Sequence, residues 1–129
     1  MPSLIEIYSM ANLIEKYGKL LDGLYRKTVN KELVWEISSW DEELYTVVGG
    51  RRIRLTGGRD ANGSPVERIE VLYGDDVIDS FSDGRLEDLP QDPSFHSYYL
   101  KMRALRMTAT RQAKGADDAL DAILDDLSD

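Results

Sequence analysis

Apolar residues recur every three to four positions near both ends of this 129-residue chain and every second position in its middle. The first period places side chains on one face of a helix, and the second places them on one face of a strand. The chain is therefore predicted to have an α+β fold, in which helices pack on one face of an antiparallel sheet. Because one domain typically takes roughly 100–200 residues, we expect a single domain over residues 1–129.

An N-terminal helix is predicted over residues 4–25. Ser3 precedes it as an N-cap and has Glu6 three residues on, which is the spacing of a capping box. The apolar positions of this helix form two adjacent stripes, namely Leu4, Tyr8, Ala11, Ile14, Leu21 and Tyr25, and Met10, Leu13, Tyr17, Leu20 and Leu24. They leave only a narrow polar strip, so we expect another helix or a second subunit to cover part of this surface.

Five strands are predicted in the middle of the chain, over residues 33–38, 44–48, 52–56, 67–73 and 77–81. Short turns join most of them, and the pair Gly49 and Gly50 accepts the positive φ values of a tight hairpin. This order predicts an antiparallel meander with one packed face and one solvated face. Residues 57–65 are rich in turn formers and are predicted to be an exposed, mobile loop, while Trp35 alternates with core residues and is predicted to be packed.

The C-terminal part is predicted to form one or two helices, beginning near Ser94. We favour two helices separated at Gly115, because bases precede this glycine and acids follow it, as the dipoles of two successive helices favour. A single helix over residues 95–127 is the alternative, since the apolar stripe continues through Gly115 and an interior glycine costs only about 1 kcal/mol. We expect the helix after Gly115 to dock on the protein's own sheet and help cover the first helix, with a partner's groove as the alternative.

The composition excludes several kinds of chemistry. The chain has no cysteine and one histidine, which removes disulfides, thiolate nucleophiles, thiolate zinc sites, iron–sulfur ligation and multi-histidine metal sites within one chain. The first residues lack a basic, apolar leader, so we expect no signal peptide, no membrane span and a cytosolic location. We predict no cofactor.

Three groups of residues resemble functional sites, but none has the pattern that such a site needs. His96 has no nucleophile motif beside it, and the glycine pairs at residues 49–50 and 57–58 lack the spacing of phosphate-binding loops. The acidic residues of the middle segment match no metal-binding loop; they are Asp75, Asp76, Asp79, Asp83, Glu87, Asp88 and Asp92. We therefore predict no catalytic residue and no metal site.

The net charge of −8 resides entirely in the second half of the chain, because residues 1–64 hold nine bases and nine acids. A basic strand that includes Arg52 and Arg54 and a basic helix could attract RNA, but the overall negative field of the protein opposes nucleic acid as a partner. The bases of that helix are Lys101, Arg103, Arg106, Arg111 and Lys114. We expect them to pair with the acidic segments beside them.

These observations predict a small acidic protein that is non-catalytic and acts as a protein–protein interaction module, most simply as a homodimer. The first and last helices are the expected contacts. The candidate interaction residues are Trp40, Arg52, Arg54, Leu120, Ile123, Leu124 and Leu127.

Two alternatives remain open. One is an antitoxin, immunity protein or secretion chaperone, whose acidic charge would match a basic client. The other is a small-molecule-binding protein or an enzyme that uses the concave face of the sheet, where Tyr45, Tyr73 and the arginines would line a pocket.

Overall fold

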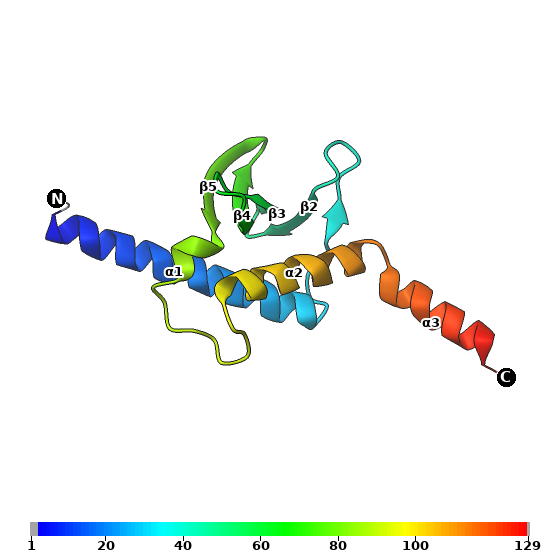
Figure 1. Ribbon diagram of the computed structural model, residues 1–129. Helices are drawn as coiled ribbons and strands as arrows, with labels where there is room; N and C mark the ends of the chain where they lie inside the picture. Colours follow the sequence, from blue (N-terminus) through cyan, green and yellow to red (C-terminus); the bar gives the residue numbers. More distant parts are fainter. Residues whose placement is uncertain (1–2, 129) are drawn as a thin grey trace.

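The helical and alternating segments of the sequence form separate layers in the computed structural model, which describes residues 3–128 (Figure 1). The elements are α1 (Leu4–Val29), β1 (Glu36–Ile37), β2 (Leu44–Val48), β3 (Arg51–Arg59), β4 (Pro65–Tyr73), β5 (Asp76–Ser82), the 3-10 helix η1 (Asp83–Leu86), α2 (Tyr98–Ala113) and α3 (Ala116–Leu127). The α+β class, the five-stranded antiparallel sheet and the two C-terminal helices are thereby confirmed.

The sheet is a meander in the order β1-β2-β3-β4-β5, and every neighbouring pair is antiparallel. Gly49 and Gly50 have φ values of 60° and 73°, which the two-residue turn between β2 and β3 requires and which glycine adopts without strain. The row that crosses the sheet on its packed face consists of Leu44, Leu55, Ile69 and Phe81. All four side chains are buried.

Helix α2 lies against β1 to β4, and α1 packs against α2 and η1. Leu21 of α1, Leu86 of η1 and Leu105 of α2 have no exposed surface and mark the centre of the core. Tyr17 stacks on Phe81 with a ring-centroid distance of 4.2 Å, which fixes α1 to β5. The part of α1 before Tyr17 projects beyond the sheet, as Figure 1 shows at the blue end of the chain.

The first strand is shorter than predicted. Only Glu36 and Ile37 pair with β2, although a strand was expected over residues 33–38. The preceding residues leave the ladder because Trp35 turns into the core and its indole Nε1 donates a hydrogen bond of 2.9 Å to Thr28 Oγ1 of α1. Trp35 is buried, as its alternation with core residues predicted.

The loop expected over residues 57–65 is exposed but shorter than predicted, because β3 continues to Arg59 and β4 begins at Pro65. Arg59 pairs with Pro65, so that only residues 60–64 form the turn. The Asp60 carboxylate closes this turn by accepting backbone hydrogen bonds from Asn62 and Ser64.

Gly57 lies within strand β3, although glycine is more typical of turns. A Cβ atom there would lie 2.5 Å from Nη2 of Arg106, so the absent side chain makes room for the guanidinium group. Arg106 in turn binds the buried Glu67 through two hydrogen bonds of 2.6 and 2.9 Å. A glycine inside a strand often marks such a close approach.

The helix boundaries follow the caps. Ser3 and Glu6 form the predicted capping box, and α1 extends four residues beyond its predicted end, to Val29. Helix α2 begins at Tyr98, later than predicted, because Ser97 caps it by accepting a hydrogen bond from the Leu100 backbone. Gly115 has a φ of 66°, in the left-handed region, so the predicted separation into two helices is confirmed.

The expectation that the last helix docks on the sheet is wrong. None of the residues of α3 is buried, and the helix extends away from the body at the red end of the chain in Figure 1. The left-handed conformation of Gly115 turns the chain away from the direction of α2, so the apolar stripe of α2 does not continue along the same surface. Helix α3 therefore does not cover α1.

Removal of residues 116–129 should leave the fold almost unchanged, because the deleted helix buries no side chain. We expect the melting temperature to change by no more than about 2 °C. Leu105→Ala, which leaves a cavity at a fully buried site, should instead lower the free energy of unfolding by about 2–5 kcal/mol. Thermal denaturation followed by circular dichroism compares the melting temperatures of the two variants. A decrease in the truncated chain as large as the decrease in Leu105→Ala would contradict the exposed position of α3.

Candidate interaction surfaces

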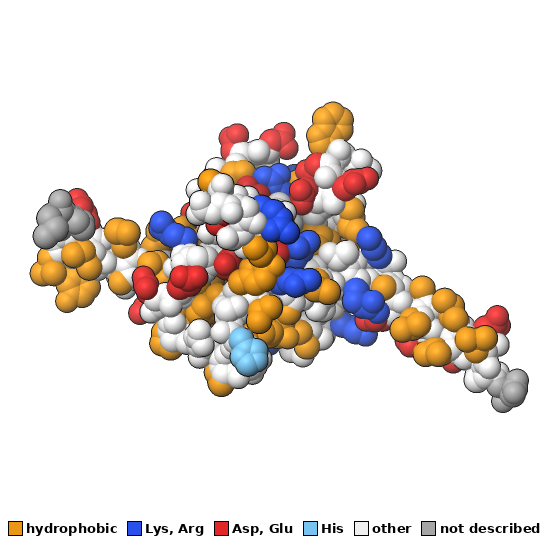
Figure 2. Space-filling model, in the orientation of Figure 1, with side chains coloured by type: hydrophobic (Ala, Val, Ile, Leu, Met, Phe, Trp, Pro, Cys, Tyr) orange, Lys and Arg blue, Asp and Glu red, His pale blue; other side chains and the backbone are white. Residues whose placement is uncertain are grey.

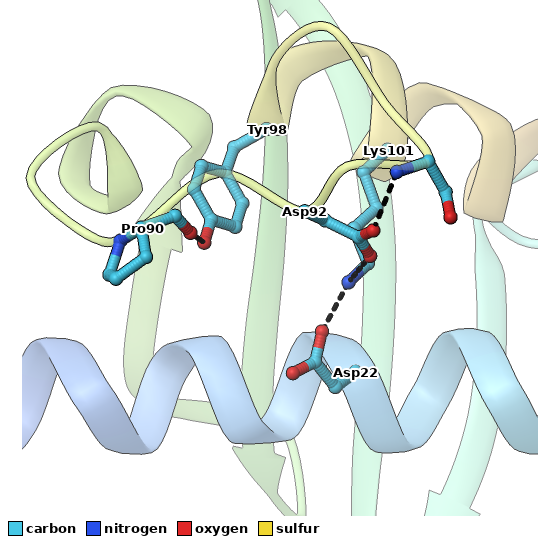
Figure 3. Close-up of polar contacts among 6 residues, drawn as sticks. Asp22, Pro90, Asp92, Tyr98 and Lys101 are labelled. Carbon is cyan, nitrogen blue, oxygen red and sulfur yellow. Dashed lines mark hydrogen bonds and ion pairs between the residues drawn. The ribbon is translucent and has the colours of Figure 1, made fainter.

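One buried charge fixes the two long helices to each other. The side chain of Lys101, on α2, is 4% exposed and lies between Asp22 of α1 and Asp92 of the segment before α2 (Figure 3). Lys101 Nζ donates hydrogen bonds to both carboxylates, and the one to Asp92 measures 2.9 Å. Tyr98 closes the same segment from the other side by donating its hydroxyl proton to the Pro90 carbonyl.

The ionisation of this cluster follows from its contacts. Burial alone would lower the pKa of Lys101, but the hydrogen bonds to Asp22 and Asp92 outweigh it and raise that pKa above the ordinary value. The pKa of Asp92 is lowered by a hydrogen bond from the Ser94 backbone and by Lys101. Lys101 and Asp92 are thus both held in their charged forms at neutral pH.

A second polar connection joins the ends of α1 and α2. Thr28, on α1, is fully buried; its hydroxyl accepts the Trp35 hydrogen bond, and its carbonyl accepts one of 2.7 Å from Gln112 Nε2. Gln112 lies in the last turn of α2, shortly before Gly115. The start of α3 is therefore held close to the end of α1.

Helix α3 presents an apolar stripe to solvent. Leu120, Ile123, Leu124 and Leu127 are 49–75% exposed and recur at the spacing i, i+3, i+4 and i+7. Figure 2 shows their end of the molecule as a hydrophobic patch with acidic groups beside it. These four candidates from the sequence are thus brought together on one exposed face.

The other end of the molecule carries a second exposed apolar surface, which the sequence prediction named only as part of the first helix. Leu4, Ile5, Ile7, Tyr8 and Met10 all lie at least 49% exposed on the projecting part of α1. The sequence predicted how wide the apolar surface of α1 is. It did not predict which half of that surface the body covers, because this depends on where β5 and η1 contact the helix.

Trp40 lies in the turn between β1 and β2 and is 93% exposed. The turn is ordered around it: the Trp40 backbone donates to Ser38 Oγ, and the Asp41 carboxylate accepts from the Glu43 backbone and from the Tyr45 hydroxyl. This turn points away from α3 in Figure 1, so Trp40 does not join the apolar stripe of that helix.

Arg52 and Arg54 lie together on the face of the sheet that the helices leave open. Arg52 stacks over the Tyr45 ring at 4.0 Å, and Arg54 makes two hydrogen bonds of 2.9 and 3.0 Å to Glu70 and one to the Tyr45 hydroxyl. The bonds to Glu70 and Tyr45 raise the pKa of Arg54. Arg52, Arg54, Tyr45 and Glu70 thus form one connected polar group on this face.

The structure also contains open hollows. One of about 680 Å³ runs along β1 and β2 and is lined by Val34, Tyr45, Val47 and Arg52, among others. Another, of about 460 Å³, lies between the sheet and α2 beside Glu43 and Arg106. Burial, together with the nearby Asp41, raises the pKa of Glu43. Of the basic groups that line them, Arg52 stacks on Tyr45 and Arg106 is paired with Glu67.

The expected pairing of the helix bases with the acidic segments beside them is confirmed for Lys101 and Arg111, whereas Arg106 pairs with an acid of β4. Lys101 binds Asp92, Arg106 binds Glu67, and Arg111 binds Asp117 at 2.6 Å across the junction of α2 and α3. The last pair is exposed and so contributes little to folding. It does place the acidic start of α3 beside the basic end of α2.

Within residues 3–128, no helix has the length and apolar character needed to cross a membrane. No group of three or more histidine, aspartate or glutamate side chains in this range is arranged to hold a metal ion.

The chain matches no protein-family model, and comparison with curated proteins and with solved structures finds no match either.

The Lys101 cluster makes a prediction about acid stability. Asp92 in the unfolded chain takes up a proton near pH 4, whereas its folded pKa is lower. The unfolded state therefore binds more protons in this range, and the contribution of Asp92 to stability is present above pH 4 and lost as the pH falls through the folded pKa.

Asp92→Asn should consequently be less stable than the natural protein at pH 7 and should lose less stability between pH 5 and pH 3. Urea denaturation at a series of pH values measures the free energy of unfolding of both proteins as a function of pH. The conservative change Asp88→Asn, on an exposed acid of the same segment, serves as the control. If the free energy of unfolding depended on pH in the same way for Asp92→Asn and the natural protein, the stabilising role of the Asp92 carboxylate would be contradicted.

Proposed function

We propose that this protein is a non-catalytic interaction module that binds a basic protein partner through α3. The supporting observation is that α3 buries none of its side chains in its own fold, yet carries an apolar stripe. An amphipathic helix of this kind binds by laying its apolar stripe in a groove of another protein. A cytoplasmic location is part of the proposal.

The arrangement of side chains on α3 supports a groove as the binding site. Its four large apolar residues lie within one face of the helix, at the spacing that groove-binding helices use for their anchors. The aspartates occupy the remaining circumference, at positions 117, 118, 121, 125 and 126. A groove with an apolar floor and charged rims would contact both surfaces at once.

The charge of α3 supports a basic partner. The helix contains five aspartates and no base. Asp117 and Asp118 lie in its first turn, where the helix dipole stabilises them, but Asp125 and Asp126 lie near its C-terminal end, where the dipole is unfavourable to negative charge. Lysine or arginine side chains on the rim of a groove would relieve this repulsion and would also speed association.

The length of α3 favours a partner as well. A twelve-residue helix without tertiary packing is marginal in water, because isolated helices shorter than about 12–15 residues form poorly. Docking in a groove would supply the packing that the protein's own sheet does not. Proteins that neutralise or escort a basic client, such as antitoxins, immunity proteins and secretion chaperones, would need such a surface.

The test compares the proteins that bind natural and altered α3. Tagged natural protein, Leu124→Lys and the control Val34→Lys are used to capture proteins from the native cell lysate after nuclease treatment. Val34 is also an exposed apolar residue, but it lies outside α3. We expect a stoichiometric basic protein that binds the natural protein and Val34→Lys and is lost with Leu124→Lys.

The captured protein would then be purified and titrated calorimetrically against each variant at low and high salt. We expect Leu124→Lys to weaken binding at least tenfold, because an anchor is lost and an ammonium group is placed against apolar surface. Salt should weaken binding of the natural protein. A partner that binds Leu124→Lys as tightly as the natural protein would refute the assignment of α3.

A further inference from the structure

The projecting part of α1 carries a regular seam of apolar side chains. Leu4, Ile7, Ala11 and Ile14 follow one another at alternating intervals of three and four residues, which is the a and d pattern of a coiled coil. The same intervals continue to Gly18 and Leu21. One packing face therefore runs along the helix from its first turn into the core.

The body of the protein covers only the second part of this face. Gly18 and Leu21 are buried, and Ile14 is partly covered, but Leu4 is 71% and Ile7 is 50% exposed. Residues 4–11 span about 10 Å at 1.5 Å per residue, so the seam continues for roughly that distance beyond its cover. Figure 2 shows hydrophobic side chains gathered along this end of the molecule.

The charges beside this seam distinguish it from α3. Between Ser3 and Lys16, α1 carries two acids, Glu6 and Glu15, and the single base Lys16. Two such helices can approach each other without strong repulsion, whereas two copies of α3 would bring ten aspartates together. The projecting part of α1 is thus compatible with its own copy, and α3 is not.

We propose that residues 4–14 of α1 pair with the same residues of a second copy of this chain, in antiparallel orientation. The direction follows from the position of the body, which covers the same face of α1 from Tyr17 onward. In a parallel pair, both bodies would need to occupy the space between the two helices. In an antiparallel pair, they lie at opposite ends of the seam.

The antiparallel pair has a defined register. It places Leu4 against the partner's Ile14 and Ile7 against the partner's Ala11. The small side chain of Ala11 leaves room for Ile7, so the two helices can approach closely. This interface uses no residue of α3, and the two surfaces can therefore be tested separately.

The oligomeric state tests the proposal directly. Sedimentation equilibrium over a range of concentrations should give the natural protein a mass approaching twice the 14.6 kDa of one chain as the concentration rises. Ile7→Glu should remain at 14.6 kDa at concentrations at which the natural protein is mostly dimeric. The matched control is Ser9→Glu, which adds the same charge two residues away on the opposite face of the helix and should dimerise normally.

Both substitutions are at exposed positions, so circular dichroism should show the secondary structure of the natural protein in each monomer. A natural protein that stays at the mass of one chain at every concentration would overturn the proposal. So would an Ile7→Glu variant that dimerises as well as Ser9→Glu.

Disulfide cross-linking tests the orientation, because the chain has no cysteine of its own. Ile7→Cys and Ala11→Cys variants that carry different tags are mixed and oxidised. We expect the mixed disulfide as the main product, because the antiparallel register brings these two positions together. A main product in which Ile7→Cys is linked to itself would overturn the antiparallel arrangement.

Discussion

The ammonium group of Lys101 joins parts of the chain that are far apart in sequence. Its contact with Asp22 spans 79 residues, and its contact with Asp92 fastens the irregular segment that leads into α2. A charge removed from water is costly unless it is paired and hydrogen-bonded, so this group favours the one arrangement in which both carboxylates reach it. The direction in which the first part of α1 leaves the body therefore depends on how α1 and α2 are fastened at this point.

Periodicity predicted most of the fold because each element follows from local patterns. The capping box at Ser3, the glycine hairpin after β2 and the left-handed Gly115 all depend on conformational preferences of one or two residues. The errors came from contacts between distant segments. Gly57 was assigned to a loop because its proximity to Arg106 is invisible in sequence, and the first strand was predicted too long because Thr28 draws Trp35 out of the ladder.

The candidate surfaces were predictable in composition but not in accessibility. The stripe of Leu120, Ile123, Leu124 and Leu127 was recognised, yet its exposure depends on the direction that the chain takes after Gly115. Arg54 is engaged within the protein by hydrogen bonds to Glu70 and Tyr45, which its charge alone did not indicate. Sequence patterns identify which faces are apolar or charged, whereas tertiary structure decides which of them the protein itself uses.

The two exposed apolar surfaces, on the projecting part of α1 and on α3, lie at opposite ends of the long axis of the molecule (Figure 1). Occupation of one would leave the other accessible. A pair of chains joined through α1 would hold two copies of α3 on one particle, turned outward from the joining seam. Such a bivalent particle would bind a client with two grooves, or an assembled client, by avidity: the second contact forms at a high effective concentration, so that weak individual helices give a long-lived complex.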